Sequence, residues 1–148
     1  MSYFQGKKKL LNIFIKLLNR PKINWSNFEL ESSLKLNDFV DILLEPIKSS
    51  NYSYRIKLGL HEALVNAVTH GNKLDPHKSI RVRRIVTPNW CVWQIQDQGN
   101  GIEIKKRIYK LPKKISSING RGLYIINECF DDIRWSNKGN RLQLALKR

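Results

Sequence analysis

The chain has 148 residues, of which 41% are hydrophobic and 26% are charged. This length and composition predict one globular domain with its own core and exclude wholesale disorder. No apolar run reaches the roughly 20 residues of a membrane span, and no cleavable signal is expected. Two distant cysteines match no metal-binding spacing, so we expect a reduced, cytoplasmic protein. The net charge of +15 is typical of proteins that bind nucleic acid, an anionic membrane or a polyanionic ligand.

Residues 1–23 are basic and contain no acid. Apolar residues at helical spacing predict an amphipathic helix over residues 7–22. We interpret residues 1–23 as a basic N-terminal extension and residues 24–148 as the domain. The extension either packs against the domain or a second copy, lies on an anionic membrane through residues 7–20, or is partly disordered. Packing or a partner contact is favoured, because the apolar face is wider than that of a simple surface helix.

The remaining elements alternate between strands and helices along the chain. The patterns predict a strand at 27–31, helices at 34–47 and 54–70, strands at 80–86 and 91–97, a helix from 120 to 130, and strands at 133–136 and 142–146. A polar, basic stretch separates the third strand from the last helix. This order predicts an α+β fold, a two-layer α/β sandwich with a mixed, mostly antiparallel sheet and helices on one face.

The helix at 54–70 carries Glu62, Asn66 and His70 at intervals of four residues. This spacing puts the three side chains on one helix face, opposite the apolar residues. A carboxylate can accept a proton, and an amide oxygen can bind a hard cation such as Mg²⁺. Taken alone, the same stripe is also typical of a solvated helix face.

Two glycine-bearing segments follow. In the first, a strand ends at Asp97, and Gly99 and Gly101 precede Ile102. The glycines allow a sharp turn close to a ligand, and a buried carboxylate accepts an exocyclic amine such as that of adenine, although such sequences also form ordinary turns.

In the second segment, the last helix opens at Gly120-Arg121-Gly122-Leu123. Backbone N–H groups at a helix N-terminus favour phosphate oxygens, and Arg121 adds a charged donor. A glycine-rich capping turn is the alternative interpretation of this segment.

The three segments follow one another in the order of known nucleotide-binding boxes. Their patterns are E-x3-N-x3-H-G-N, D-x-G-x-G-I and G-R-G-L-x-I-I. The sequence resembles the gyrase, chaperone and histidine-kinase ATPase superfamily, which has the Bergerat-type ATP-binding fold. Within it, the chain resembles the anti-sigma-factor serine/threonine kinases. The resemblance covers about residues 24–148.

The resemblance implies ATP and Mg²⁺ as cofactors. It makes Asn66 the Mg²⁺ ligand, Glu62 the general base and Asp97 the adenine-binding residue. The other positions that it assigns to the ATP site are His70, Gly99, Gly101, Ile102, Gly120, Arg121, Gly122 and Leu123. One departure is Asn140-Arg141, where many relatives have a small residue and a threonine that supports the phosphate side.

The implied function is an ATP-binding anti-sigma regulatory factor, an ATP-dependent protein serine/threonine kinase that acts on a small anti-anti-sigma-type protein. A sigma factor is the expected partner, and a homodimer is expected from the resemblance alone. The alternatives are an ATP-dependent binding module with weak or no kinase activity, a basic nucleic-acid-binding domain, and a detached histidine-kinase catalytic half. Direct nucleic acid binding is not expected, because the sequence lacks a helix-turn-helix or an aromatic-basic strand signature.

Overall fold

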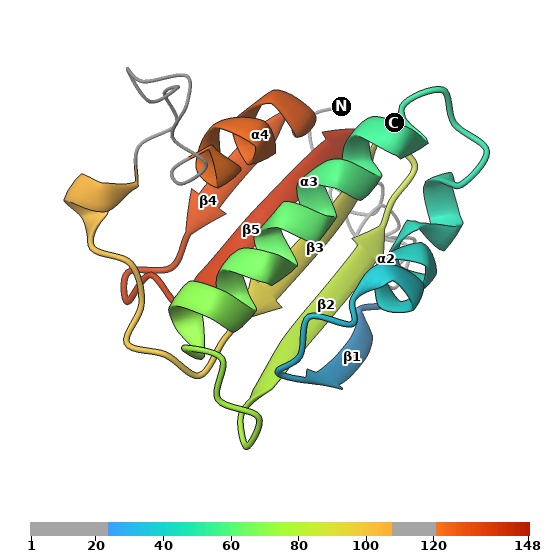
Figure 1. Ribbon diagram of the computed structural model, residues 1–148. Helices are drawn as coiled ribbons and strands as arrows, with labels where there is room; N and C mark the ends of the chain where they lie inside the picture. The colour runs from blue at the N-terminus through green and yellow to red at the C-terminus, as the bar shows by residue number, and fades with distance from the viewer. Residues whose placement is uncertain (1–23, 108–120) are drawn as a thin grey trace, which may run out of the picture.

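A computed structural model describes residues 24–107 and 121–148 (Figure 1). The expected helix at 7–22 and the expected site residue Gly120 lie outside the described residues.

Five strands form a single sheet in the order β1-β2-β3-β5-β4. Their bounds are Ser26–Glu31 for β1, Ser79–Val86 for β2, Trp90–Gln96 for β3, Asp132–Trp135 for β4 and Arg141–Lys147 for β5. Each described pairing is antiparallel, which confirms the antiparallel-rich sheet predicted from the alternating sequence patterns. Burial alternates along β3, as expected for a strand with one face against the core.

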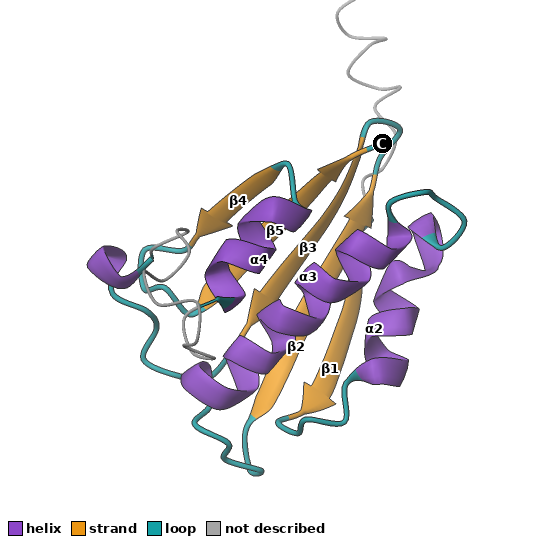
Figure 2. Cartoon of the chain, turned by 45° about the horizontal axis from the view of Figure 1, so that its top comes forward, coloured by secondary structure: helices purple, strands orange, loops and turns teal. Residues whose placement is uncertain are grey.

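Three helices, α2, α3 and α4, lie side by side on one face of this sheet (Figures 1 and 2). Their bounds are Asn37–Leu44 for α2, Ser53–Asn66 for α3 and Gly122–Cys129 for α4. Short turns extend them: the 3-10 helix η1, Glu45–Ile47, follows α2, and the π-helical turn η2, Ala67–Gly71, follows α3. A further 3-10 turn, η3, spans Ile104–Lys106. The two-layer α+β sandwich is therefore confirmed.

The core lies between the helices and the sheet, and Trp93 of β3 is its largest fully buried side chain. The Trp93 indole N–H donates a hydrogen bond to the carbonyl of Leu43 at the end of α2, at 3.1 Å. Its ring also packs edge-to-face on Phe130, just after α4, with 5.9 Å between centroids. One central residue thus anchors both outer helices to the sheet, with α3 between them (Figure 1).

Both cysteines are free and buried. Burial raises the pKa of Cys91 to about 11, against the opposing influence of nearby arginines. Burial also raises the pKa of Cys129. Both thiols are therefore protonated at neutral pH.

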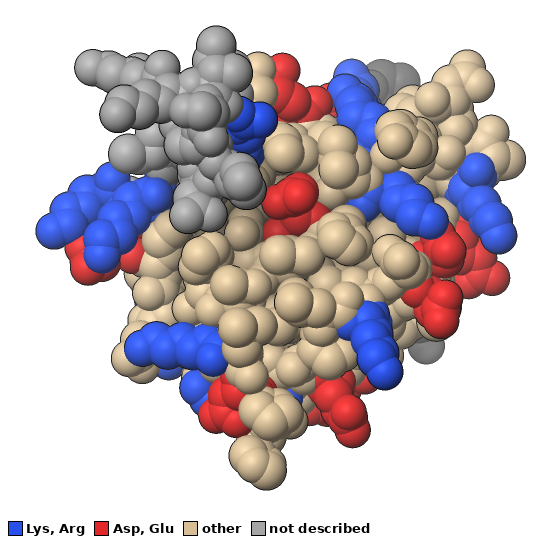
Figure 3. Space-filling model, in the orientation of Figure 1, with Lys and Arg blue, Asp and Glu red and all other residues tan. Residues whose placement is uncertain are grey.

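Positive charge is unevenly distributed along the chain. All twelve acidic residues lie in the described part, whereas nine of the 27 basic residues lie in residues 1–23 and 108–120. On the helix-bearing face, basic and acidic side chains are interspersed around a largely uncharged centre (Figure 3). Within residues 24–107 and 121–148, no helix is both long and apolar enough to span a membrane.

Candidate functional site

The polar face of α3 meets the first residue of α4. Glu62 and Asn66 are half-buried, whereas Leu60 and Leu64 on the opposite side of the helix are fully buried. A Cβ atom added to Gly122 would lie 3.1 Å from Asn66 Nδ2 and 3.2 Å from Glu62 Oε2. Only a residue without a side chain fits there unless its neighbours give way. The structure therefore brings an acid, an amide and a helix N-terminus together.

The N-terminus of α4 can attract an anion. Arg121 occupies the N-cap position, and among residues 24–107 and 121–148 no side chain caps the helix. The first N–H groups of a helix lack partners within it, and the helix dipole makes this end positive. Such an end favours an anion, and Arg121, half-buried beside it, adds a positive charge. Leu123, by contrast, packs against the hydrophobic core.

His70 does not continue the line of Glu62 and Asn66. It lies in the π turn η2, where the N–H of Asn72 bonds to the carbonyl of Ala67 at 2.8 Å, five residues earlier. A π turn contains more residues than an α turn, so a spacing of four no longer completes one turn. His70 is consequently exposed, and no described contact joins it to Glu62 or Asn66.

The carboxyl group of Asp97 packs beneath this π turn. A Cβ atom added to Gly71 would lie 2.6 and 2.7 Å from the two carboxylate oxygens. Asp97 Oδ1 accepts a hydrogen bond from the N–H of Gly99 at 2.7 Å. Burial raises the pKa of Asp97, while the Gly99 hydrogen bond, Lys138 and Lys78 act in the opposite direction. The geometry leaves Oδ2 without a hydrogen bond in the described part of the chain.

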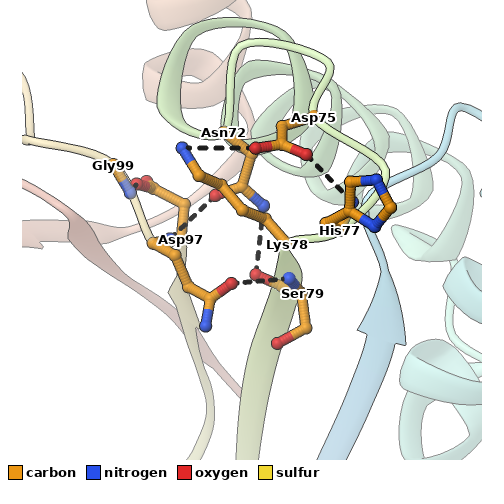
Figure 4. A network of polar contacts seen from close by, with 8 residues as sticks. Asn72, Asp75, His77, Lys78, Ser79, Asp97 and Gly99 are labelled. Carbon is orange, nitrogen blue, oxygen red and sulfur yellow. Dashed lines mark hydrogen bonds and ion pairs between the residues drawn. The ribbon is translucent and has the colours of Figure 1, made fainter.

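A fully buried amide, Asn72, holds this region together. Its Oδ1 accepts from the N–H of Gln98 at 2.8 Å, and its Nδ2 donates to the carbonyl of Ser79 at 3.0 Å (Figure 4). Gln98 in turn accepts from the N–H of Ser79 at 2.8 Å. Asn72 thereby joins the end of the π turn to β2 and to the loop after β3. In the sequence it stands out only as the residue after the helix-stopping glycine.

Gly99 and Gly101 each let the loop after β3 lie close to another backbone segment. A Cβ atom on Gly99 would lie 2.7 Å from the carbonyl carbon of Gly71. Gly101 has a φ of +85°, in the left-handed region, and its backbone lies against that of Lys138. The N–H of Ile102 donates to the carbonyl of Gly139 at 3.0 Å. The loop after β3 is thus fastened to the β4–β5 turn.

Arg107 reinforces this junction. Its guanidinium donates to the carbonyl of Ile102 through Nε at 3.2 Å and Nη2 at 3.1 Å, and Nη2 also reaches that of Ser136 at 3.3 Å. An open hollow of about 440 Å³ lies between the two loops. Its lining consists of Asn100, Gly101, Ile102, Glu103, Lys105, Arg107, Asn137 and Lys138. Two of the expected site residues, Gly101 and Ile102, line the hollow, whereas Glu62, Asn66, Asp97 and Gly122 do not.

Asn140 lies at the Asp97 end of the site. The N–H of Asp97 donates to the carbonyl of Asn140 at 3.0 Å, and Asn140 Nδ2 donates to the carbonyl of Asp97 at 3.2 Å. The antiparallel pairing of β3 and β5 places Asn140 beside Asp97.

A model of the histidine kinase-like ATPase domain matches residues 41–146. The chain belongs to this family. No curated protein matches the sequence significantly. The matched segment contains Glu62, Asn66 and Gly122, which converge in space, and also Asp97, which lies with Gly71 and Gly99. Membership indicates a domain that binds ATP.

The residues present fit such a ligand. The carboxylate oxygen Oδ2 of Asp97, which has no hydrogen bond within the described residues, can accept a base amine. In the described residues no three histidines, cysteines or acids gather to hold a metal ion. The amide oxygen of Asn66 is of the type that could hold Mg²⁺ together with phosphate oxygens and waters, which is how Mg²⁺ usually binds with nucleotides.

Proposed function

We propose that this histidine kinase-like ATPase domain is an anti-sigma regulatory factor that acts as an ATP-dependent protein serine/threonine kinase. Its substrate would be a small anti-anti-sigma-type protein, and its second partner a sigma factor. The observation that carries the proposal is the convergence of Glu62, Asn66 and Gly122 at the N-terminus of α4. An acid beside a phosphate-binding helix end is the arrangement that transfer to a hydroxyl group requires.

Each residue has a distinct role in this proposal. Asn66 binds the cation with its amide oxygen, and the α4 N-terminus with Arg121 binds the phosphates. When bound, Mg²⁺-ATP supplies the phosphoryl group and neutralises part of its charge. Glu62 accepts the proton of the acceptor serine or threonine hydroxyl at a carboxylate oxygen. Asp97 accepts a hydrogen bond from the adenine amine.

Calorimetry of Mg²⁺-ATP binding tests the assignment of roles. We expect Asn66→Ala to weaken Mg²⁺-dependent affinity about tenfold or more, since a hydrogen bond or ligand contact to a charged group contributes about 1.5–3 kcal/mol. Glu62→Gln should still bind ATP. Glu128→Gln, an exposed acid on α4, is the matched control and should behave as wild type. Wild-type protein that binds no ATP up to millimolar concentration would refute the proposal.

Phosphate transfer needs a second experiment. The Glu62→Gln protein with Mg²⁺-ATP serves as bait to capture a partner, and wild-type protein is then incubated with that partner and γ-labelled ATP. With the wild type we expect label on a serine or threonine of the partner. With Glu62→Gln we expect the rate of labelling to fall 10²-fold or more.

A second candidate function is an ATP-dependent binding module without efficient transfer. The Asn140-Arg141 pair favours it, because many relatives have a small residue and a threonine at these two positions. Nucleotide-dependent capture of the partner without any label on it would select this candidate.

A further inference from the structure

The sheet face that points away from the three helices carries a row of apolar side chains. The register pairs Ile85 of β2 with Val92 of β3, and Val92 with Ala145 of β5. Trp93, the next residue after Val92, is buried under the helices, so strand alternation directs Val92 and its partners to the opposite face. Helices α2, α3 and α4 all lie on the Trp93 side (Figure 2). Ile85 and Ala145 are nevertheless buried, and Val92 is half-buried.

A buried hydrogen-bond acceptor lies beside this row. Gln94, two residues after Val92, projects to the same face, and its Nε2 donates to Gln143 Oε1 at 2.8 Å. The Oε1 atom of Gln94 is buried, and within the described residues it accepts no hydrogen bond. Buried acceptors are almost always paired, because leaving one without a donor is costly. This face is therefore not an ordinary surface in water, and it lacks a donor that the described residues do not provide.

The described chain begins at the edge of the apolar row. Ser26, the first residue of β1, pairs with Arg84. Continuing that register by one residue brings Trp25 level with Ile85. The Trp25 ring lies on the guanidinium of Arg83, 4.6 Å from its centroid, and Arg83 projects to the same face as Ile85. The segment that precedes β1 therefore joins the domain beside the row.

We propose that the N-terminal extension, residues 1–23, folds back over this sheet face and packs its apolar side chains on the row of Ile85, Val92 and Ala145. As a helix, residues 7–20 would be about 21 Å long, and the distance from β1 to β5 is roughly 14 Å. The helix is thus long enough to cross all four strands. Pro21 ends it, and the three residues that follow can span about 10 Å, enough to turn back onto the sheet. The apolar residues at helical spacing are Leu10, Leu11, Phe14, Leu17 and Leu18.

Connectivity and charge favour the chain's own extension over that of a second copy at this face. A flexibly tethered segment has an effective concentration of about 1 mM, whereas two copies that each carry a net charge of +15 repel each other. The six basic side chains of the extension are all donors, so one of them can provide the hydrogen bond that Gln94 Oε1 lacks. Cations of the face itself are already engaged, since Arg134 pairs with Asp132 at 2.7 Å and Arg83 with Trp25.

Cross-linking in the full chain tests this contact. Phe14→Cys is combined with Val92→Cys, and the protein is treated with a short bismaleimide. The natural cysteines are buried and react slowly. The matched control combines Phe14→Cys with Leu58→Cys, an exposed apolar position on α3 in the helix layer. We expect the cross-link within one chain to form about tenfold faster or more with Cys at position 92 than at position 58, as mass spectrometry of the monomer would measure.

Two outcomes would overturn the inference. Equal rates for the two pairs would mean that the extension does not rest on this face. Cross-links that join two chains would mean that the extension of a second copy occupies it. If Val92→Cys does not fold, Gln143→Cys replaces it with the same expectation, because Gln143 lies on the same face in the next row. The inference does not depend on ATP binding, so failure to bind nucleotide would leave it standing.

Discussion

Asp97 is half-buried and lies between the backbone of Gly71 and the N–H group of Gly99. Burial raises its pKa, which means that the folded protein binds this proton more tightly than the unfolded chain does. Stability associated with this group is therefore lost as the pH rises through the range between the unfolded and the folded pKa. Above that range the carboxylate is ionised in both states, and its partial burial in the folded protein costs stability.

Replacing this charge should raise the thermal stability of the protein and lower its affinity for adenosine. In Asp97→Asn the amide oxygen can still accept from Gly99, but no charge is buried. We expect a higher melting temperature than wild type at pH 7, with the difference shrinking as the pH is lowered through the pKa of Asp97. Adenosine affinity should fall at least tenfold, because a charge-assisted hydrogen bond is lost. A variant that melts lower at pH 7 and retains adenosine affinity would contradict this account.

The same group predicts the pH dependence of base binding. Adenosine is the suitable ligand, since it carries no phosphate that titrates. Protonated Asp97 has one oxygen fewer to accept the amine, so adenosine affinity should fall as the pH drops through the raised pKa. Well below that pKa, the affinity for adenosine should fall at most about tenfold for each pH unit. Calorimetry between pH 4 and 8 measures it, and the Asp97→Asn variant, which has no carboxyl group here, should give a flat profile.

Among the elements, the π turn η2 determines how α3 meets the loop after β3. It ends at Gly71, whose backbone contacts the Asp97 carboxyl group. Gly71→Ala would force a methyl group within 2.6 Å of Asp97 Oδ2. We expect a loss of about 1–3 kcal/mol in the free energy of unfolding, as for other overpacked sites, together with weaker adenosine binding.

Chemical denaturation measures this loss. The matched control is His70→Ala, an exposed position in the same turn, where a stability change within about 0.5 kcal/mol is expected. If Gly71→Ala and the wild type had equal free energies of unfolding, the segment after β3 that contains Asp97 would have to move aside at little cost.

Periodicity alone predicted most elements to within a few residues. Glu62 and Asn66 share a face because α3 is regular there, and their half-burial agrees with the pattern. The position of His70 could not be predicted in this way, because local sequence does not distinguish a π turn from an α turn. The roles of Asn72 and Asn140 also escaped prediction. Their partners are Ser79 at the start of β2 and residues 97 and 98 just after β3, and only the register of the sheet brings them together.

For the whole molecule, the distribution of charge separates the extension from the domain. Residues 1–23 carry six basic residues and no acid, whereas the described part contains every acid. We expect a chain of residues 24–148 to fold and bind ATP with unchanged affinity, as circular dichroism and calorimetry would measure.

The membrane alternative for residues 7–20 predicts that the full chain, but not residues 24–148, binds vesicles that contain an anionic lipid, and that salt weakens this binding. Vesicles of neutral lipid are the control. Equal vesicle binding by both chains would place the contact on the domain and not on the extension.

The reactivity of the two buried thiols can report whether the two layers of the fold open together or separately. Cys91 lies in the central strand β3, and Cys129 is the last residue of α4, so each layer of the sandwich contains one. A thiol-modifying reagent reaches either only after local opening, and its rate of reaction reports the free energy of that opening. Equal protection of both cysteines would mean that the layers separate as one unit. A faster reaction at Cys129 would mean that α4 detaches while the sheet stays closed, and bound ATP should then slow that site alone.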